Sequence, residues 1–150
     1  IATEADPDRF LSAVADGYRV SFGDASNMKL VEAVGGSNAR AVVLGFSRYE
    51  VSREVTPTIT RRFPDLVRFV AVDSRLDLER YLDLGVRAHF AAGQPKGIEM
   101  VADILLTLGI PEPDVREWME EEAERFSIGD ASGQDADDDD DDPDLIEVAA

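Results

Sequence analysis

Two carboxylates stand where an apolar run of the sequence gives way to a turn. Glu4 closes the opening segment Ile1-Ala2-Thr3, and Asp24 lies in the turn Gly23-Asp24-Ala25-Ser26, which ends the alternating run 18–22. A strand, a tight turn and a helical pattern follow one another there, as in an open α/β sheet, whose ligands bind beyond the carboxyl ends of the strands. In a dinucleotide-binding sheet, an acidic residue at the end of the second strand binds the ribose hydroxyls. Glu4 has that position relative to its strand and the helix that follows.

The turn also fits a purely structural role. Ser26 can act as the N-cap of the following helix and accept a hydrogen bond from one of its free backbone N–H groups. A capped corner between a strand and a helix requires no ligand. The residues of the turn alone leave both interpretations open.

The elements that must position these residues follow from the apolar pattern. The continuous apolar run Ala41–Leu44 and the run Leu66–Val72 are typical of strands buried on both faces of a parallel sheet. Further strands are expected at 1–4, 19–22 and 87–90, and helices at 7–16, 27–34, 51–63, 78–84, 97–108 and 114–126. This β-α alternation with short loops predicts an α/β fold with a doubly wound, mostly parallel, Rossmann-like sheet. The opening strand lacks its beginning, so we expect an N-terminally incomplete domain taken from a longer chain.

The composition excludes several kinds of site. The 150 residues contain no cysteine and 1 histidine, His89. Thiolate metal sites and disulfides are therefore excluded, and histidine-based chemistry has little to draw on. We expect His89 to be structural, no metal site, and no enzyme activity, because no nucleophile–base pair is evident.

The charge is strongly negative and unevenly spread. The formal net charge is -17, and residues 127–150 hold 10 acids and no bases. Such a balance disfavours binding to nucleic acid or to anionic lipid. An acid-rich, lysine-poor surface is common in proteins from a salt-loaded cytoplasm, where ions screen the self-repulsion. No apolar run reaches the roughly 20 residues that a membrane-spanning helix needs.

Three regions are expected along the chain. Residues 1–110 form the α/β domain, and residues 111–128 form an acidic C-terminal helix that follows Pro111 and Pro113. Residues 129–150, with the run Asp137–Asp142, are predicted to be a disordered acidic tail because they hold too few apolar residues to form a core.

Four segments together resemble a known family. They are IATEADPDRF, GYRVSFGDASNMKLVEAVGGSNARAVVLGF, RRFPDLVRFVAVDSRLDLERYLDLGV and IEMVADILLTLGI. They are similar to the nucleotide-binding RCK domain, also called TrkA-N, and most of all to the version fused to Kef-type potassium/proton antiporters. In that family an acidic end of strand 2 precedes Asp-Pro, and a Gly-Asp-Ala turn ends strand 3. The likeness covers residues 1 to about 126 and lacks the first strand, the glycine-rich loop and the first helix.

The resemblance implies a set of binding residues. Glu4 matches the ribose-binding acid, and Asp24 and Ala25 match the residues that flank adenine, with Ser26 in the same turn. Gly45-Phe46-Ser47 would line the same crevice. The chain departs from Kef-type members at Ala71 and Asp73, where those members usually carry arginines, and at Ser47, where they tend to carry aspartate.

The resemblance also implies a function and its partners. It predicts a regulatory domain at the cytoplasmic face of the cell membrane that binds NAD(H) or an adenine nucleotide (AMP, ADP or ATP). The ligand would gate a potassium or other monovalent cation transporter by favouring one arrangement of the domains. The expected partners are a membrane transport domain, on the same chain or as a separate subunit, and a second copy in a homodimer.

Two other functions remain open. A fragment of a soluble Rossmann NAD-binding oxidoreductase would need a substrate domain downstream with a catalytic residue, yet the chain continues into an acidic tail. A degenerate receiver-like signalling domain would need a phospho-acceptor aspartate at a strand end, where this chain has Ser47.

Overall fold

A computed structural model describes residues 1–45, 48–90, 97–130 and 146–149 of the chain. The strands within these ranges are β1 (Ala2–Glu4), β2 (Val20–Phe22), β3 (Ala41–Leu44), β4 (Val67–Val72), β5 (Arg87–Phe90) and β6 (Ile146–Ala149). The helices are α1 (Pro7–Ala15), α2 (Met28–Ala33), α3 (Tyr49–Arg62), α4 (Arg75–Asp83), α5 (Ile98–Thr107) and α6 (Glu112–Asp130).

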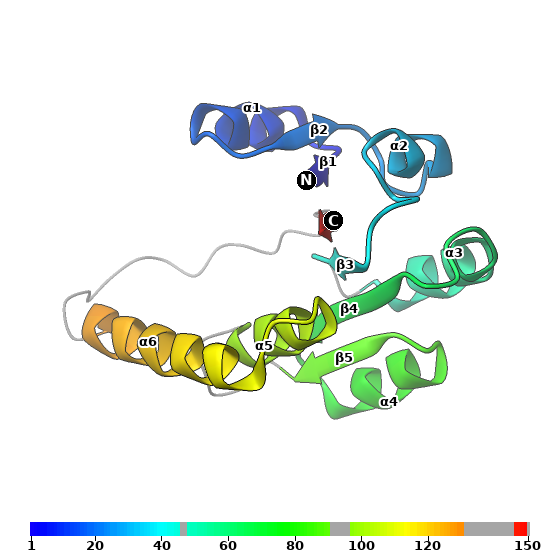
Figure 1. Cartoon of the computed structure of the whole chain (residues 1–150). Coiled ribbons are helices and arrows are strands. Elements are labelled where there is room, and N and C mark those ends of the chain that lie inside the picture. Colours follow the sequence, from blue (N-terminus) through cyan, green and yellow to red (C-terminus); the bar gives the residue numbers. More distant parts are fainter. Residues whose placement is uncertain (46–47, 91–96, 131–145, 150) are drawn as a thin grey trace.

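The strands form one sheet in the order β2-β1-β6-β3-β4-β5 (Figure 1). β1 pairs with β2, β3 with β4 and β4 with β5, all in parallel. The chain thus builds outward from β1 to β2 on one side of the sheet and from β3 to β5 on the other. This confirms the predicted doubly wound, mostly parallel, Rossmann-like fold.

The C-terminal strand differs from the expectation of a disordered tail over 129–150. Residues 146–149 form β6, which lies antiparallel between β1 and β3 (Figure 1), and α6 continues to Asp130. The facing edges of β1 and β3 carry backbone N–H and C=O groups that need partners, and an inserted strand supplies them. Residues 131–145, which include the run Asp137–Asp142, lie outside the described residues.

The two predicted buried strands each present one face to α5 and the other to α3 and α4. Ala41 and Phe69 pack with Ile104 of α5 in one cluster. Val70, on the opposite face of β4 from Phe69, packs with Tyr81 of α4 in another. Because both faces are covered, the sequence of these strands is apolar at nearly every position rather than alternating.

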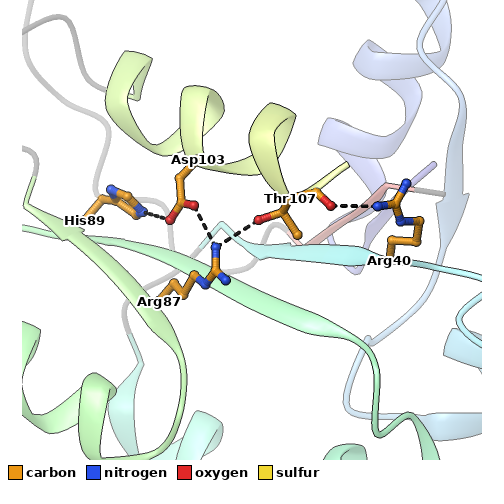
Figure 2. A network of polar contacts seen from close by, with 5 residues as sticks. All are labelled: Arg40, Arg87, His89, Asp103 and Thr107. Atoms are coloured by element: carbon orange, nitrogen blue, oxygen red, sulfur yellow. Dashed lines mark hydrogen bonds and ion pairs between the residues drawn. The ribbon is translucent and has the colours of Figure 1, made fainter. Parts of the chain in front are cut away.

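Polar contacts fix α5 on the sheet (Figure 2). Arg87 Nη1 donates to Asp103 Oδ1 at 2.7 Å and to Thr107 Oγ1 at 2.9 Å. His89 Nε2 lies 3.2 Å from the other oxygen of Asp103, and Arg40 Nη2 donates to the carbonyl of Thr107 at 2.7 Å. His89 therefore takes part in a structural contact, as the sequence suggested.

The acidic helix α6 lies beside α5 (Figure 1). Val115 in its first turns is buried, whereas Phe126 near its end is 49 % exposed. None of the helices in the described part of the chain has both the length and the apolar character that crossing a bilayer requires.

Candidate functional site

A cavity of about 500 Å³ lies at the carboxyl ends of β1, β2 and β3. One wall comes from the chain that follows β1 and β2, and the other from the end of β3, Arg48 and one side of α3. The first wall contains Ala5, Asp24, Ala25 and Ser26, and the second contains Leu44, Arg48, Val51, Ser52, Glu54, Val55 and Ile59. The cavity is thus at the edge of the sheet where the sequence predicted a ligand crevice.

The turn after β2 brings Asp24, Ala25 and Ser26 to the cavity. The N–H of Gly23 donates to the carbonyl of Glu4 at 2.8 Å, so the ends of β1 and β2 are joined directly. Asp24 Oδ1 accepts a hydrogen bond from the N–H of Ser26 at 2.7 Å. The carboxylate therefore fixes its own turn and places all three predicted residues on one wall.

The predicted N-cap of α2 was wrong by one residue. Asn27 caps the helix, because its side-chain oxygen accepts from the N–H of Lys29 at 3.1 Å. Ser26 is already held in the turn by Asp24, so the helix begins one residue later. Ser26 is therefore part of the cavity wall and does not cap the helix.

Glu4 is buried at the end of β1, with 1 % of its surface exposed. Its Oε1 accepts a hydrogen bond from the N–H of Asp6 at 2.7 Å, whereas Oε2 is buried and has no hydrogen-bond partner in the described part of the chain. Glu4 itself does not line the cavity, although the next residue, Ala5, does. A carboxylate oxygen only accepts hydrogen bonds, and an unpartnered one in the interior is costly. The second carboxylate oxygen of Glu4 therefore needs a hydrogen-bond donor from outside the described part of the chain.

The remaining predicted residues follow β3. Gly45 is exposed and is not part of the cavity wall. Phe46 and Ser47 lie outside the described residues. Their expected contribution to the crevice stays a prediction.

The sequence analysis missed the wall formed by α3. The residues of α3 and its N-cap that line the cavity are Arg48, Val51, Ser52, Glu54, Val55 and Ile59. Arg48, Ser52, Val55 and Ile59 follow one another at intervals of three and four, which is the spacing of one helix face. That spacing is visible in the sequence, but it does not reveal that the polar residues Arg48, Ser52 and Glu54 line a cavity.

Carboxylates do not gather around the cavity in a way that would bind a cation. Asp24 and Glu54 belong to opposite walls, and Arg48 adds a positive charge on the side of α3. Among the residues that the structure describes, no group of three or more metal-ligating side chains is found. The walls thus offer carboxylate acceptors together with hydroxyl and guanidinium donors.

The chain matches a known family model and is similar to several solved chains. The sequence model of the TrkA-N domain matches residues 1–91. The chain is also similar to the Kef CTD of Shewanella denitrificans in its AMP-bound form, with 22 % sequence identity. That likeness covers 85 % of this chain and 90 % of the other, with a TM-score of 0.44.

Proposed function

The chain belongs to the TrkA-N domain family, and on that premise we propose that its crevice binds NAD(H) or an adenine nucleotide. Glu4 accepts hydrogen bonds from the ribose hydroxyls. Asp24, Ala25 and Ser26 form the wall beside the adenine. The bound nucleotide regulates a cation transporter and undergoes no reaction.

The observation that carries this proposal is the carboxylate oxygen of Glu4 to which none of the described residues donates a hydrogen bond. The oxygen is buried at the end of β1, where nucleotide-binding sheets place their ribose-binding acid. The cavity begins at the next residue, Ala5. A ribose hydroxyl would supply the missing donor, because a hydroxyl can donate to the carboxylate and still accept from another group.

We propose that the transporter is a Kef-type potassium or other monovalent cation:proton antiporter, with this domain at the cytoplasmic face of the membrane. The domain pairs with a second copy through α6, and the nucleotide favours one arrangement of the pair. Such control requires the nucleotide to bind more tightly to one arrangement than to the other. The half-exposed Phe126 on α6 supports a contact of this kind.

Calorimetric titration tests the binding step. The full chain is titrated with NAD(H), AMP, ADP and ATP at low and high salt, and the nucleotide that binds is then compared with its 2′,3′-dideoxy analogue. We expect saturable binding of at least one nucleotide and a loss of about tenfold or more for the analogue, since hydrogen bonds to a charged group contribute about 1.5–3 kcal/mol. Absence of binding by all four nucleotides at both salt concentrations would refute the proposal.

The regulatory step needs a separate measurement on the whole transporter. Ion-driven proton exchange is recorded in vesicles with and without the nucleotide, for the natural protein and for Glu4→Ala. Glu54→Ala is the matched control, because Glu54 also lines the cavity but is exposed. We expect Glu4→Ala to abolish the response to nucleotide and Glu54→Ala to retain it. If transport by Glu4→Ala still responds to the nucleotide, the nucleotide does not control transport through this site.

A further inference from the structure

Two buried hydroxyl groups lie near each other on the α3 side of the cavity. Ser52 of α3 is 2 % exposed and Tyr81 of α4 is fully buried. Neither hydroxyl has a hydrogen-bond partner in the described part of the chain. Burial raises the pKa of the Tyr81 phenol, and the nearby Ser52 hydroxyl partly opposes that rise. The two groups therefore approach each other without meeting the geometry of a hydrogen bond.

The ring of Tyr81 lies among apolar side chains, and the charges of Asp77 and Arg80 act on its phenol from nearby. The residue packs in a cluster with Leu44, Val70 and Val72, and the ring of Tyr49 meets it edge to face at 5.6 Å between centroids. A phenylalanine ring would pack among these apolar side chains without leaving an unpaired polar atom. Buried hydroxyls are normally hydrogen-bonded, so an unpartnered one calls for an explanation. The hydroxyl of Ser52 is the neighbour able to satisfy that of Tyr81.

The backbone groups of Ser52 are already committed. Its N–H donates to the carbonyl of Arg48 at 3.1 Å, and its carbonyl accepts from Thr56 Oγ1 at 2.6 Å. Thr56 Oγ1 in turn accepts from Arg68 Nη1 at 2.9 Å, which fixes this turn of α3 against β4. The side-chain oxygen is the polar atom of Ser52 for which the described residues supply no partner, and Ser52 lines the cavity.

We propose that Ser52 is a specificity-determining residue of the cavity, whose hydroxyl donates a hydrogen bond to a ring nitrogen of the bound purine while it accepts one from Tyr81. This inference rests on the proposed function. A hydroxyl group can donate and accept at the same time, so one chain of two hydrogen bonds satisfies both buried oxygens. The buried Ser52 oxygen needs a side-chain rotamer that turns it toward the cavity for this contact.

Asp24, on the wall that follows β2, indicates which purine base the cavity would prefer. Asp24 supplies a carboxylate, which only accepts hydrogen bonds, whereas Ser52 supplies a donor. Adenine offers a donor amino group together with acceptor ring nitrogens. Hypoxanthine carries an oxygen in place of that amino group, and this oxygen would face the carboxylate as a second acceptor. We therefore expect the site to prefer AMP over IMP.

The experiment combines base analogues with substitutions in the full chain. AMP, IMP and the 1-deaza, 3-deaza and 7-deaza analogues of AMP are titrated into the natural protein, Ser52→Ala and Tyr81→Phe. We expect Ser52→Ala and one of the deaza analogues each to weaken binding about tenfold, and the two together to cause no further loss, because they remove the same hydrogen bond. Tyr81→Phe keeps the ring and should weaken AMP binding by a few-fold. Thr60→Ala, which removes an exposed hydroxyl from the same helix, should leave binding unchanged.

The outcomes separate this inference from the function on which it rests. Binding of AMP to Ser52→Ala with unchanged affinity would overturn the role of Ser52, as would a deaza series in which no analogue is coupled to Ser52. Either result fits a water molecule between the two hydroxyls and leaves the proposed function standing. If the natural protein binds no adenine nucleotide, the proposed function itself fails. Thermal melts of each variant, recorded without ligand, show that a loss of affinity does not arise from unfolding.

Discussion

Replacement of Glu4 by glutamine should move stability and nucleotide binding in opposite directions. Glutamine has the same shape, and its side-chain carbonyl can keep the hydrogen bond that the N–H of Asp6 donates at 2.7 Å. The change removes a negative charge from a residue that is 1 % exposed and whose second oxygen has no partner in the described part of the chain. An unsatisfied buried group costs about 1–3 kcal/mol, and more when it is charged. Without ligand, Glu4→Gln should therefore leave the free energy of unfolding unchanged or raise it by up to about 2 kcal/mol.

Binding should weaken in the same variant. A hydrogen bond to a charged group contributes about 1.5–3 kcal/mol, against about 0.5–1.5 kcal/mol for a neutral one. The difference of roughly 1.4 kcal/mol corresponds to about a tenfold rise in the dissociation constant for the nucleotide. The amide of glutamine still offers a group to the ribose, so the loss should be smaller than the loss caused by Glu4→Ala.

Urea unfolding and calorimetric titration, carried out on the same protein samples, measure the two quantities. Glu54→Gln is the control, since it removes an equal charge from an exposed residue on the opposite wall of the cavity. It should change affinity by less than about twofold, because an exposed charge is screened by solvent. A Glu4→Gln variant that loses more than about 1 kcal/mol of stability and binds nucleotide as before would refute the reasoning. The carboxylate would then act as a structural anchor and not as a ligand for ribose.

The sequence predicted the layered fold because the buried strands leave a strong local signal. Ala41–Leu44 and Val67–Val72 are apolar at nearly every position, and the structure covers both of their faces. Strand β6 left no comparable signal. Its pairing with β1 and β3 joins residues more than a hundred positions apart, and the acidic segment before it is typical of a tail. Pairing at such separation depends on which sheet edges are open, and a local pattern does not record that.

The candidate site was predicted on one wall and missed on the other for a similar reason. Glu4 and Asp24 are marked in the sequence because each ends a strand, and strand ends are where α/β sheets bind ligands. Ser52 is in the interior of a helix, where a serine has no special meaning until the rotation of α3 about its axis is known. The error at Ser26 has a more local origin. Serine and asparagine are equally good N-caps, so propensity did not separate Ser26 from Asn27.

Gly23→Ala, with Gly17→Ala as its control, tests the turn after β2, and Asp103→Asn tests how α5 is held on the sheet. Gly23 has a φ of +145°, and a Cβ built on it would lie 2.8 Å from Leu30 Cδ2, whereas Gly17 has a φ of +86° and nothing within 4 Å. Urea unfolding should therefore show a loss of about 3 kcal/mol for Gly23→Ala, from backbone strain plus overpacking, and only about 1 kcal/mol for Gly17→Ala. Equal losses would mean that Leu30 moves aside freely. The substitution Asp103→Asn removes the charge that pairs with Arg87. The paired atoms are 2.7 Å apart, but the side chains of Asp103 and Arg87 are 31 % and 48 % exposed. Solvent screening should limit the loss to about 1 kcal/mol, and 1 M salt should remove most of it. A loss above about 2 kcal/mol that persists in high salt would show that the hydrogen bonds of Asp103, and not its charge, hold α5 on the sheet.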